Sequence, residues 1–229
     1  MESEKHSFAG LAAKRRLPSM KEILCYGDSN TWGYNPITQQ RYDMNERWTG
    51  VLQKSLGNEY HVIEEGLSGR TTVWDDPVEG EHKNGKTYLL PCLETHKPLD
   101  LVIVLLGTND LKKRFSATAF DIAYGAGALV DIVQKSGCGR NGGTPEVLLL
   151  APPPLGKLTK FAEMFEGGNE RSEKFPQYYR NVAEEYGCEF LDTSMAIQTS
   201  DVDGVHLEKE DQRLLGEAVA EKVKGILEL

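Results

Sequence analysis

The sequence has 229 residues, enough for one α/β domain with a sizeable hydrophobic core. It contains 26 Lys and Arg against 35 Asp and Glu, a net charge of -9, and 39% hydrophobic residues. This composition excludes a disordered chain, and the acidic balance argues against a nucleic-acid-binding protein. The longest apolar runs, 101–106 and 147–151, are far shorter than the roughly 18 residues that cross a bilayer, so we expect no membrane partner.

Residues 1–19 precede the first patterned segment, and we expect a disordered extension there, with an ordered arm as the alternative. In this stretch the basic cluster follows the short apolar run 8–13, which is the reverse of the order in a secretory signal peptide. The four cysteines lie far apart and form no CxxC pair: Cys25, Cys92, Cys138 and Cys188. Reduced thiols and a cytoplasmic location are therefore predicted.

From residue 20 to residue 229 the pattern predicts a single domain in which strands and helices alternate. The predicted strands are 22–26, 60–64, 99–106, 146–151 and 188–191. The predicted helices are 47–56, 88–95, 117–135, 170–186 and 208–229. This alternation is typical of an α/β fold, a three-layer doubly wound sheet of five parallel strands. Two long loops, 71–86 and 152–169, leave strand ends where such folds place their sites.

Residues 80–87 match G-x-x-x-x-G-K-[ST], the pattern of the phosphate-binding P-loop. A P-loop needs an apolar strand before it, whereas residues 74–79 contain two aspartates, a proline and a glutamate. Glu81 would also place negative charge inside an anion site. A P-loop nucleotide-binding protein is therefore only a remote alternative.

Ser29 stands at the carboxyl end of the first predicted strand, in a small polar turn. A serine in this position could act as a nucleophile, although Asp28 and Ser29 taken alone are more typical of a simple helix cap. The G-x-S-x-G elbow of the α/β-hydrolases is missing. Ser29 alone therefore leaves both interpretations open.

Three other strand ends carry residues that suit acyl transfer. Asn109 could donate its side-chain amide to an oxyanion, and Gly69 could offer a backbone N–H at close range. Asp203 lies three residues before His206, a spacing that lets the two side chains meet. Each feature alone is weak, because turns favour Asn and Gly and an acid precedes a histidine by chance. Together they point to one site at the carboxyl edge of the sheet.

These segments resemble the four blocks of the SGNH (GDSL) hydrolase family. In chain order the blocks are Gly27-Asp28-Ser29, Gly69, Gly107-Thr108-Asn109-Asp110 and Asp203-Gly204-Val205-His206. Further segments are similar to its bacterial arylesterase/acyltransferase branch: 47–52, 64–72, 75–77, 90–93 and 165–168. The resemblance covers residues 21–229 and implies the flavodoxin-like strand order 2-1-3-4-5.

The resemblance also implies the site. Ser29 is expected to be the nucleophile, His206 the base and Asp203 its orienting partner. The expected oxyanion hole combines the backbone N–H groups of Ser29 and Gly69 with the amide of Asn109. No metal and no cofactor are implied.

The predicted function is a serine esterase that hydrolyses short-chain carboxylic esters, with acyl transfer to alcohols. Asn30, Trp32 and Tyr34 are predicted to bind the substrate, with core packing as the alternative for the two aromatic residues. Asn30 stands where the family usually has leucine. A polar residue there keeps open a carbohydrate O-deacetylase with the same triad. A non-catalytic binding protein is disfavoured because no triad residue is missing.

We also predict a homo-oligomer. The two long loops carry Trp74, Phe161, Met164 and Phe165, and exposed apolar loops tend to form interfaces. The alternative is that these loops fold back as a lid on a monomer.

Overall fold

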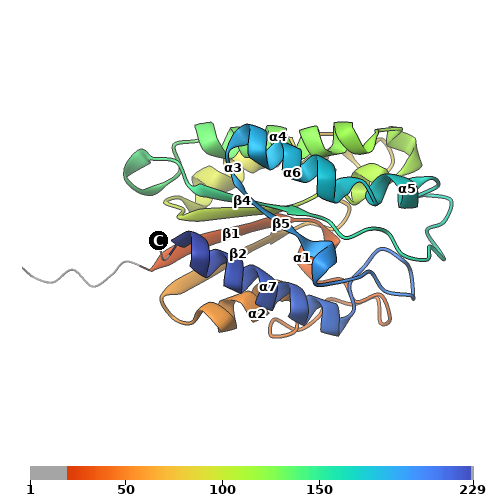
Figure 1. Cartoon of the computed structure of the whole chain (residues 1–229), viewed down its shortest axis with the longest axis horizontal. Coiled ribbons are helices and arrows are strands. Elements are labelled where there is room, and N and C mark those ends of the chain that lie inside the picture. The colour runs from red at the N-terminus through yellow and green to blue at the C-terminus, as the bar shows by residue number, and fades with distance from the viewer. Residues whose placement is uncertain (1–19, 228–229) are drawn as a thin grey trace, which may run out of the picture.

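The computed structural model describes residues 20–227, so the predicted N-terminal extension, residues 1–19, lies outside the described residues. A parallel sheet of five strands runs through the middle of the molecule in the order β2-β1-β3-β4-β5 (Figure 1). The strands are β1 (Lys21–Gly27), β2 (Tyr60–Gly66), β3 (Leu101–Leu105), β4 (Glu146–Ala151) and β5 (Glu189–Asp192). The predicted fold class and strand order are confirmed.

Helices cover both faces of the sheet (Figure 1). On one side lie α2 (Trp48–Leu56) and α7 (Lys209–Leu227), and on the other lie α3 (Gly85–His96), α4 (Ala119–Lys135) and α6 (Phe175–Tyr186). Because both faces are covered, every residue of β3 is buried, as its continuous apolar sequence predicts. The short helices α1 (Ser29–Trp32) and α5 (Gly168–Ser172) follow β1 and the long loop after β4.

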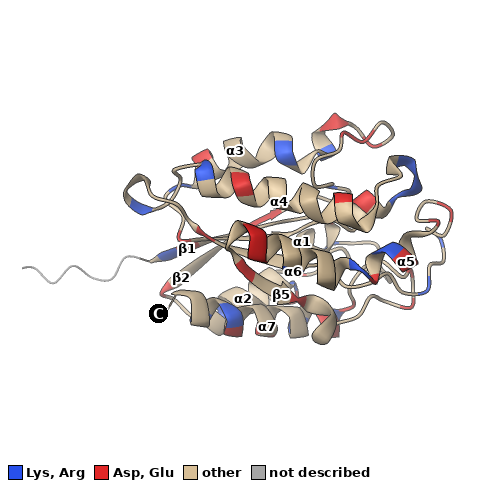
Figure 2. Cartoon of the chain, turned by 45° about the horizontal axis from the view of Figure 1, so that its top comes forward, with Lys and Arg blue, Asp and Glu red and all other residues tan. Residues whose placement is uncertain are grey.

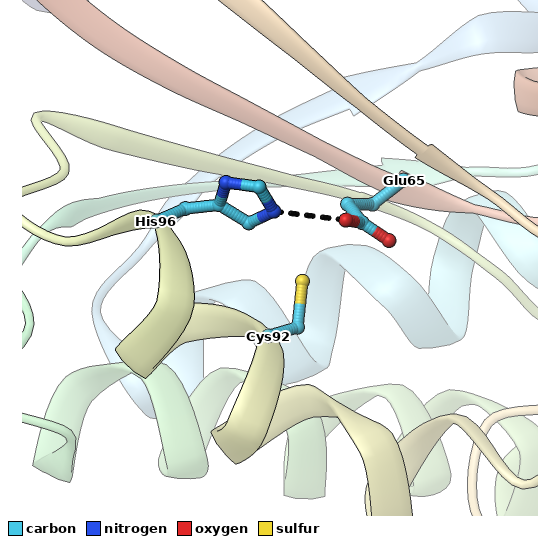
Figure 3. Close-up of side chains that lie close together, drawn as sticks. All are labelled: Glu65, Cys92 and His96. Atoms are coloured by element: carbon cyan, nitrogen blue, oxygen red, sulfur yellow. Dashed lines mark hydrogen bonds and ion pairs between the residues drawn. The ribbon is translucent and has the colours of Figure 1, made fainter.

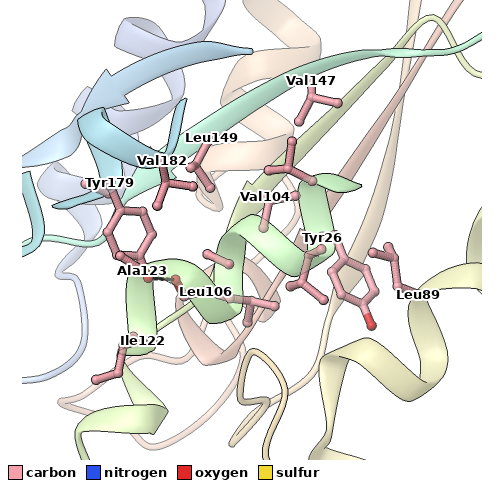
Figure 4. Packing of buried hydrophobic residues seen from close by; sticks show 14 of the residues in the cluster. Tyr26, Leu89, Val104, Leu106, Ile122, Ala123, Val147, Leu149, Tyr179 and Val182 are labelled. Atoms are coloured by element: carbon pink, nitrogen blue, oxygen red, sulfur yellow. Dashed lines mark hydrogen bonds between the residues drawn. The ribbon is translucent and has the colours of Figure 1, made fainter. Parts of the chain in front are cut away.

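Two hydrophobic clusters hold the layers together. Figure 4 shows one of them, in which Val104 and Leu149 of the sheet pack with Ile122 of α4 and Val182 of α6. The other joins the opposite face of the sheet to α2 and α7 through residues such as Trp48 and Leu215. In the view of Figure 2, the charged residues lie mainly on the helices and loops. The middle of the sheet is therefore apolar, and polar side chains gather at the strand ends.

Two predicted helices differ from the structure. The predicted helix 170–186 is divided into α5 and α6, with Pro176 in the first turn of α6, where the missing N–H costs no hydrogen bond. The predicted helix 88–95 begins earlier, at Gly85, because the Asn84 side chain caps it by accepting from Lys86 N and Thr87 N.

All four cysteines are free thiols, and three of them are buried. Within residues 20–227, no helix is long and apolar enough to cross a membrane.

The parallel register brings several loops to one edge of the sheet. Gly27, at the end of β1, pairs with Gly66 of β2 and with Leu105 of β3. The residues that follow these three strands therefore emerge side by side. They include Ser29, Gly69 and Asn109.

Candidate active site

Ser29 is the first residue of α1, and only Asp28 separates it from the end of strand β1. The turn is fixed by Asp28, whose side chain accepts a hydrogen bond of 3.0 Å from Asn30 N and caps the helix. Backbone N–H groups in the first turn of a helix have no acceptor within the helix. Ser29 thus combines a hydroxyl group with a backbone donor at the edge of the sheet.

His206 and Asp203 reach Ser29 from the loop before α7. His206 Nε2 lies 3.0 Å from Ser29 Oγ, and His206 Nδ1 lies 2.7 Å from Asp203 Oδ2. Asp203 is fully buried, and its Oδ1 accepts from the backbone N–H groups of Val205 and His206 at 2.9 Å each. Although burial opposes it, these bonds and the imidazole hold the pKa of Asp203 below its usual value. The carboxylate can therefore orient the imidazole so that Nε2 faces the serine.

Asn30 does not line the cavity beside Ser29, so the prediction that it binds substrate is corrected. Its Nδ2 donates to Val205 O at 3.3 Å, and Leu207 N donates to its Oδ1 at 3.0 Å. The amide is buried and forms hydrogen bonds with both residues that flank His206. Asn30 thus links α1, which carries Ser29, to the loop before α7 that contains Asp203 and His206. We call this segment the histidine loop. This role needs a polar side chain at this position, whatever the polarity of the pocket.

The expected oxyanion-binding residues lie beside Ser29. Gly69 has φ +83°, a conformation that favours glycine, in the loop after β2. Asn109 Nδ2 donates to Arg70 O at 3.1 Å and to Asp28 Oδ2 at 3.3 Å. Burial raises the pKa of Asp28 to about 6. The amide of Asn109 is therefore positioned by two acceptors, and the longer bond, to Asp28, is the one an oxyanion would replace most easily.

A cavity of about 210 Å³ opens above Ser29 and His206. Its apolar lining consists of Tyr34, Phe161, Met164, Phe165 and Val205. Its remaining lining consists of Ser29, Ser68, Gly69, Glu79, Asn109, Lys112 and His206. The centre of the Tyr34 ring lies 4.2 Å from that of His206, and the Phe161 ring meets the imidazole edge-on at 6.0 Å. The catalytic histidine candidate is thus flanked by aromatic rings on the cavity side.

Of the three predicted substrate-binding residues, only Tyr34 lines this cavity. Trp32 points elsewhere: Arg41 lies over its ring at 5.2 Å and donates through Nε to its carbonyl oxygen at 2.7 Å. Since α1 turns by about 100° per residue, neighbouring side chains along it face different directions. The prediction for Trp32 is corrected for this reason.

The two long loops fold back onto the molecule. Phe165 belongs to the core cluster, and Trp74 and Phe161 are partly buried against it, while Met164 is 36% exposed. Most of these aromatic side chains are therefore covered, whereas Met164 and also Val78 are exposed. Phe161, Met164 and Phe165 form one wall of the cavity above Ser29.

One of these loops brings in residues that the sequence did not single out. Glu79, from the loop after β2, and Lys112, three residues after Asn109, both line the cavity and form an ion pair. Thr72, near the start of that loop, donates from its backbone N–H to both carboxylate oxygens of Asp110 at 3.0 and 3.1 Å. Burial raises the pKa of Asp110 to about 6. In the sequence, the one feature that could have indicated a role for Lys112 is its position three residues after Asn109.

The P-loop pattern at residues 80–87 does not form a phosphate-binding loop. Residues Glu81–Lys83 form a 3-10 helix, and the preceding strand, β2, ends at Gly66, so no strand leads directly into the pattern. Gly85 N donates to Thr71 O, and Lys86 N donates to Asn84 Oδ1 at 3.0 Å and to Thr72 O at 2.9 Å. Because these N–H groups already have acceptors, they cannot cradle a phosphate group. The remote nucleotide-binding alternative is contradicted.

Within residues 20–227, one group of three metal-ligating side chains lies close together: Glu65, Cys92 and His96 (Figure 3). Their ligand atoms lie within 4.8 Å of one another, and such a donor set suits Zn²⁺. Burial raises the pKa of Cys92 to about 12, so the thiol keeps its proton. His96 Nε2 lies 2.9 Å from Glu65 Oε1, which links α3 to β2. None of the three lines the Ser29 cavity.

Known proteins resemble this chain over nearly its whole length. The GDSL-like lipase/acylhydrolase family matches residues 25–214. The M. smegmatis aryl esterase is 44% identical with a TM-score of 0.87, and the match covers 90% of this chain and 100% of that one. Est24, a carbohydrate acetylesterase from Sinorhizobium meliloti, is 43% identical with a TM-score of 0.87 and the same coverage of 90% and 100%.

A putative arylesterase from Agrobacterium tumefaciens is 37% identical with a TM-score of 0.82, and the match covers 91% of this chain and 100% of that chain. No curated protein sequence matches this chain.

A serine, a histidine and a buried aspartate in line at the carboxyl edge of a doubly wound sheet define the class of α/β serine hydrolases. The chain belongs to the GDSL-like lipase/acylhydrolase family, and it is an ester hydrolase.

Proposed function

We propose that the protein is a serine esterase that cleaves short-chain carboxylic esters through an acyl-Ser29 intermediate. The observation that carries this proposal is the chain of contacts from Asp203 to His206 to Ser29, at 2.7 and 3.0 Å. His206 Nε2 accepts the Ser29 proton as Oγ attacks the ester carbonyl carbon. The imidazolium, stabilised by Asp203, then gives that proton to the leaving alkoxide.

In the second half of the reaction, water attacks the acyl-Ser29 ester while His206 accepts a proton from it. Collapse of the tetrahedral intermediate releases the carboxylic acid and returns the proton to Ser29 Oγ. In both halves the negative oxygen accepts hydrogen bonds from the backbone N–H groups of Ser29 and Gly69 and from Asn109 Nδ2. Removing one such donor costs about 10²- to 10³-fold in kcat. Asn109→Ala should therefore lower kcat more than it raises KM.

The size of the cavity supports a short acyl group. Its volume of about 210 Å³ must hold both the acyl chain and part of the alcohol, and Phe165 and Val205 in its wall are buried core residues. A long acyl chain would have to displace these side chains, which are held by tight packing. Acetyl and propionyl esters fit this space best.

Acyl transfer to alcohols is part of the proposal. The leaving alcohol and any incoming acceptor meet His206 where Tyr34 and Phe161 flank the imidazole. Aromatic rings favour an alcohol with an apolar part over water, because binding it buries apolar surface. With an acetyl ester donor and dilute primary alcohol in buffer, we expect a transferred ester above the enzyme-free control. Acetate as the sole product would reject this part.

A carbohydrate O-deacetylase is the second candidate function. The observation that favours it is the Glu79 and Lys112 pair in the cavity wall, since charged side chains bind sugar hydroxyls well. The similarity to a carbohydrate acetylesterase supports the same candidate.

The test compares 4-nitrophenyl acetate, butyrate and octanoate with acetylated monosaccharides, using the wild type and Ser29→Ala. We expect acetate esters to be cleaved fastest and Ser29→Ala to lose at least 10³-fold in kcat while remaining folded. A folded Ser29→Ala protein with a wild-type rate would reject the serine mechanism. Faster cleavage of acetylated sugars than of aryl acetates would favour the second candidate.

Homo-oligomer formation and a cytoplasmic location stay predictions. Light scattering tests the first, since a monomer has a mass of 25.5 kDa.

A further inference from the structure

The cavity wall contains a cluster of charged side chains that the esterase reaction does not require. Lys112 Nζ lies 2.5 Å from Glu79 Oε1 and 3.5 Å from Asp76 Oδ2. Arg114 joins the cluster, 2.7 Å from the same Glu79 oxygen and 3.3 Å from the same Asp76 oxygen. Two acids face two bases, so the cluster is neutral as a whole.

Two of these four charged groups are buried, which costs free energy. The Lys112 side chain is 3% exposed and that of Asp76 is fully buried, whereas Glu79 and Arg114 are partly exposed, at 32% and 21%. Taking charged groups out of water is expensive, and well-packed apolar residues in place of a buried ion pair are often neutral or stabilising. Apolar side chains would fill this wall at a lower cost in an esterase for purely apolar substrates. The presence of charges here points to a polar ligand.

Glu79 keeps one carboxylate oxygen available. Lys112 and Arg114 both donate to Oε1, whereas no group among residues 20–227 donates to Oε2. Oε2 lies only 2.3 Å from where a Cβ on Gly69 would be. The glycine thus makes room for this oxygen next to the expected oxyanion-binding loop, in the wall of the same cavity.

Lys112 supplies a donor beside that acceptor. An ammonium group carries three N–H bonds, and Lys112 uses one on Glu79 and has only a long contact with Asp76. An acceptor and a donor side by side complement two neighbouring hydroxyl groups, one donating to Oε2 and the other accepting from Nζ. Hydrogen bonds to charged groups are stronger than neutral ones and depend on geometry.

We propose that Glu79 Oε2 and Lys112 Nζ form a subsite for vicinal hydroxyl groups of the ester substrate, as in a polyol or sugar ester. The inference rests on the proposed function, because the hydroxyl groups belong to a molecule bound at Ser29. They can lie on the alcohol part or on the acyl part of that ester. The experiment separates these two sources.

The experiment uses two pairs of esters that differ only in two hydroxyl groups. Glycerol 1-acetate and propyl acetate test the alcohol part, and ethyl glycerate and ethyl propionate test the acyl part. For each pair, the selectivity is the kcat/KM of the hydroxylated ester divided by that of its partner. This ratio removes any general effect of a variant on the reaction.

The variants are Glu79→Gln, Lys112→Met and the double variant, which keeps the net charge of the cluster. Glu79→Gln can place an N–H donor where Oε2 stood. We expect each single variant to lower the selectivity of one pair about tenfold, the usual effect of one hydrogen bond to a charged group. The pair that responds identifies the part of the substrate that is bound. Thermal unfolding of the double variant shows whether the neutral cluster folds.

Glu166→Gln and Lys113→Met provide the matched control, because this ion pair is about 60% exposed on both sides and does not line the cavity. Both should leave the selectivity ratios unchanged. Unchanged ratios for both ester pairs in folded Glu79→Gln and Lys112→Met would overturn the subsite. Activity that survives in Ser29→Ala would instead reject the proposed function.

Discussion

Replacing Asn30 by leucine tests how the histidine loop is held in place. Leucine has the same branching as asparagine but neither donates nor accepts a hydrogen bond. In the variant, Leu207 N–H and Val205 C=O both lose the partner that they have at 3.0 and 3.3 Å. Both groups are buried with the side chain, so water does not easily replace Asn30.

The size of the effect follows from these two bonds. A buried backbone group left without a partner costs about 1–3 kcal/mol, and the greater apolar burial of leucine offsets part of this. We expect the free energy of unfolding to fall by about 2–4 kcal/mol. For a chain of this length the melting temperature should then fall by about 5–15 °C.

Catalysis should suffer as well, because His206 lies between the two residues that Asn30 holds. A displacement of about 1 Å between reacting groups can cost 10²-fold, so kcat should fall by about that factor. The assay combines thermal unfolding with steady-state kinetics on 4-nitrophenyl acetate, at a temperature where the variant is folded.

Asn35→Leu is the matched control. Among residues 20–227, the Asn35 side chain accepts only from Ile37 N and Thr38 N in its own turn, at 2.9 and 3.1 Å. We expect a small loss of stability and an unchanged kcat. If Asn30→Leu keeps the wild-type melting temperature and kcat, Asn30 does not hold the loop and the reasoning fails.

Three further predictions concern protonation, stability and the P-loop pattern. The kcat/KM of the wild type should fall as the pH is lowered, because a protonated His206 cannot accept the Ser29 proton; an acid-side profile that stays flat to pH 4 would contradict this. Because burial raises the pKa of Asp110 to about 6, its contribution to stability is fully present below about pH 4 and is lost as the pH rises through about 6. Asp110→Asn should therefore make the decline in unfolding free energy between pH 4 and 6 shallower than in the wild type. Urea unfolding at several pH values measures this decline. Equal slopes of unfolding free energy against pH in the two proteins would contradict the prediction. Lys86→Ala should leave esterase activity unchanged, and calorimetry should detect no ATP binding to the wild type; measurable binding at millimolar ATP would revive the nucleotide-binding hypothesis.

The strand pattern was sufficient to predict the fold class, and the family resemblance added the strand order. Continuous apolar runs such as Leu101–Leu105 can only be buried on both faces, and helices between them lead to parallel strands. The polar residues after such strands must then meet at one edge of the sheet. Ser29, Asn109 and His206 were found in this way, together with the resemblance to a family. The structure brings their side chains within reach of one another.

The lining of the cavity depended on the tertiary structure. Asn30 comes directly after Ser29 and Trp32 lies three residues after it, yet neither lines the cavity. Tyr34, which is further along the chain, does line it. Adjacent residues in a helical turn point in different directions, so sequence proximity to a nucleophile says little about contact with substrate.

Glu79 and Lys112 lie 33 positions apart, and nothing in their local patterns marks them as a pair. They meet because the loop after β2 folds back over the end of β3 and is held there by Asp110. Such a contact is set by the packing of the whole domain. The sequence by itself therefore determined the scaffold and the reacting groups, and the tertiary structure decided which side chains surround the substrate.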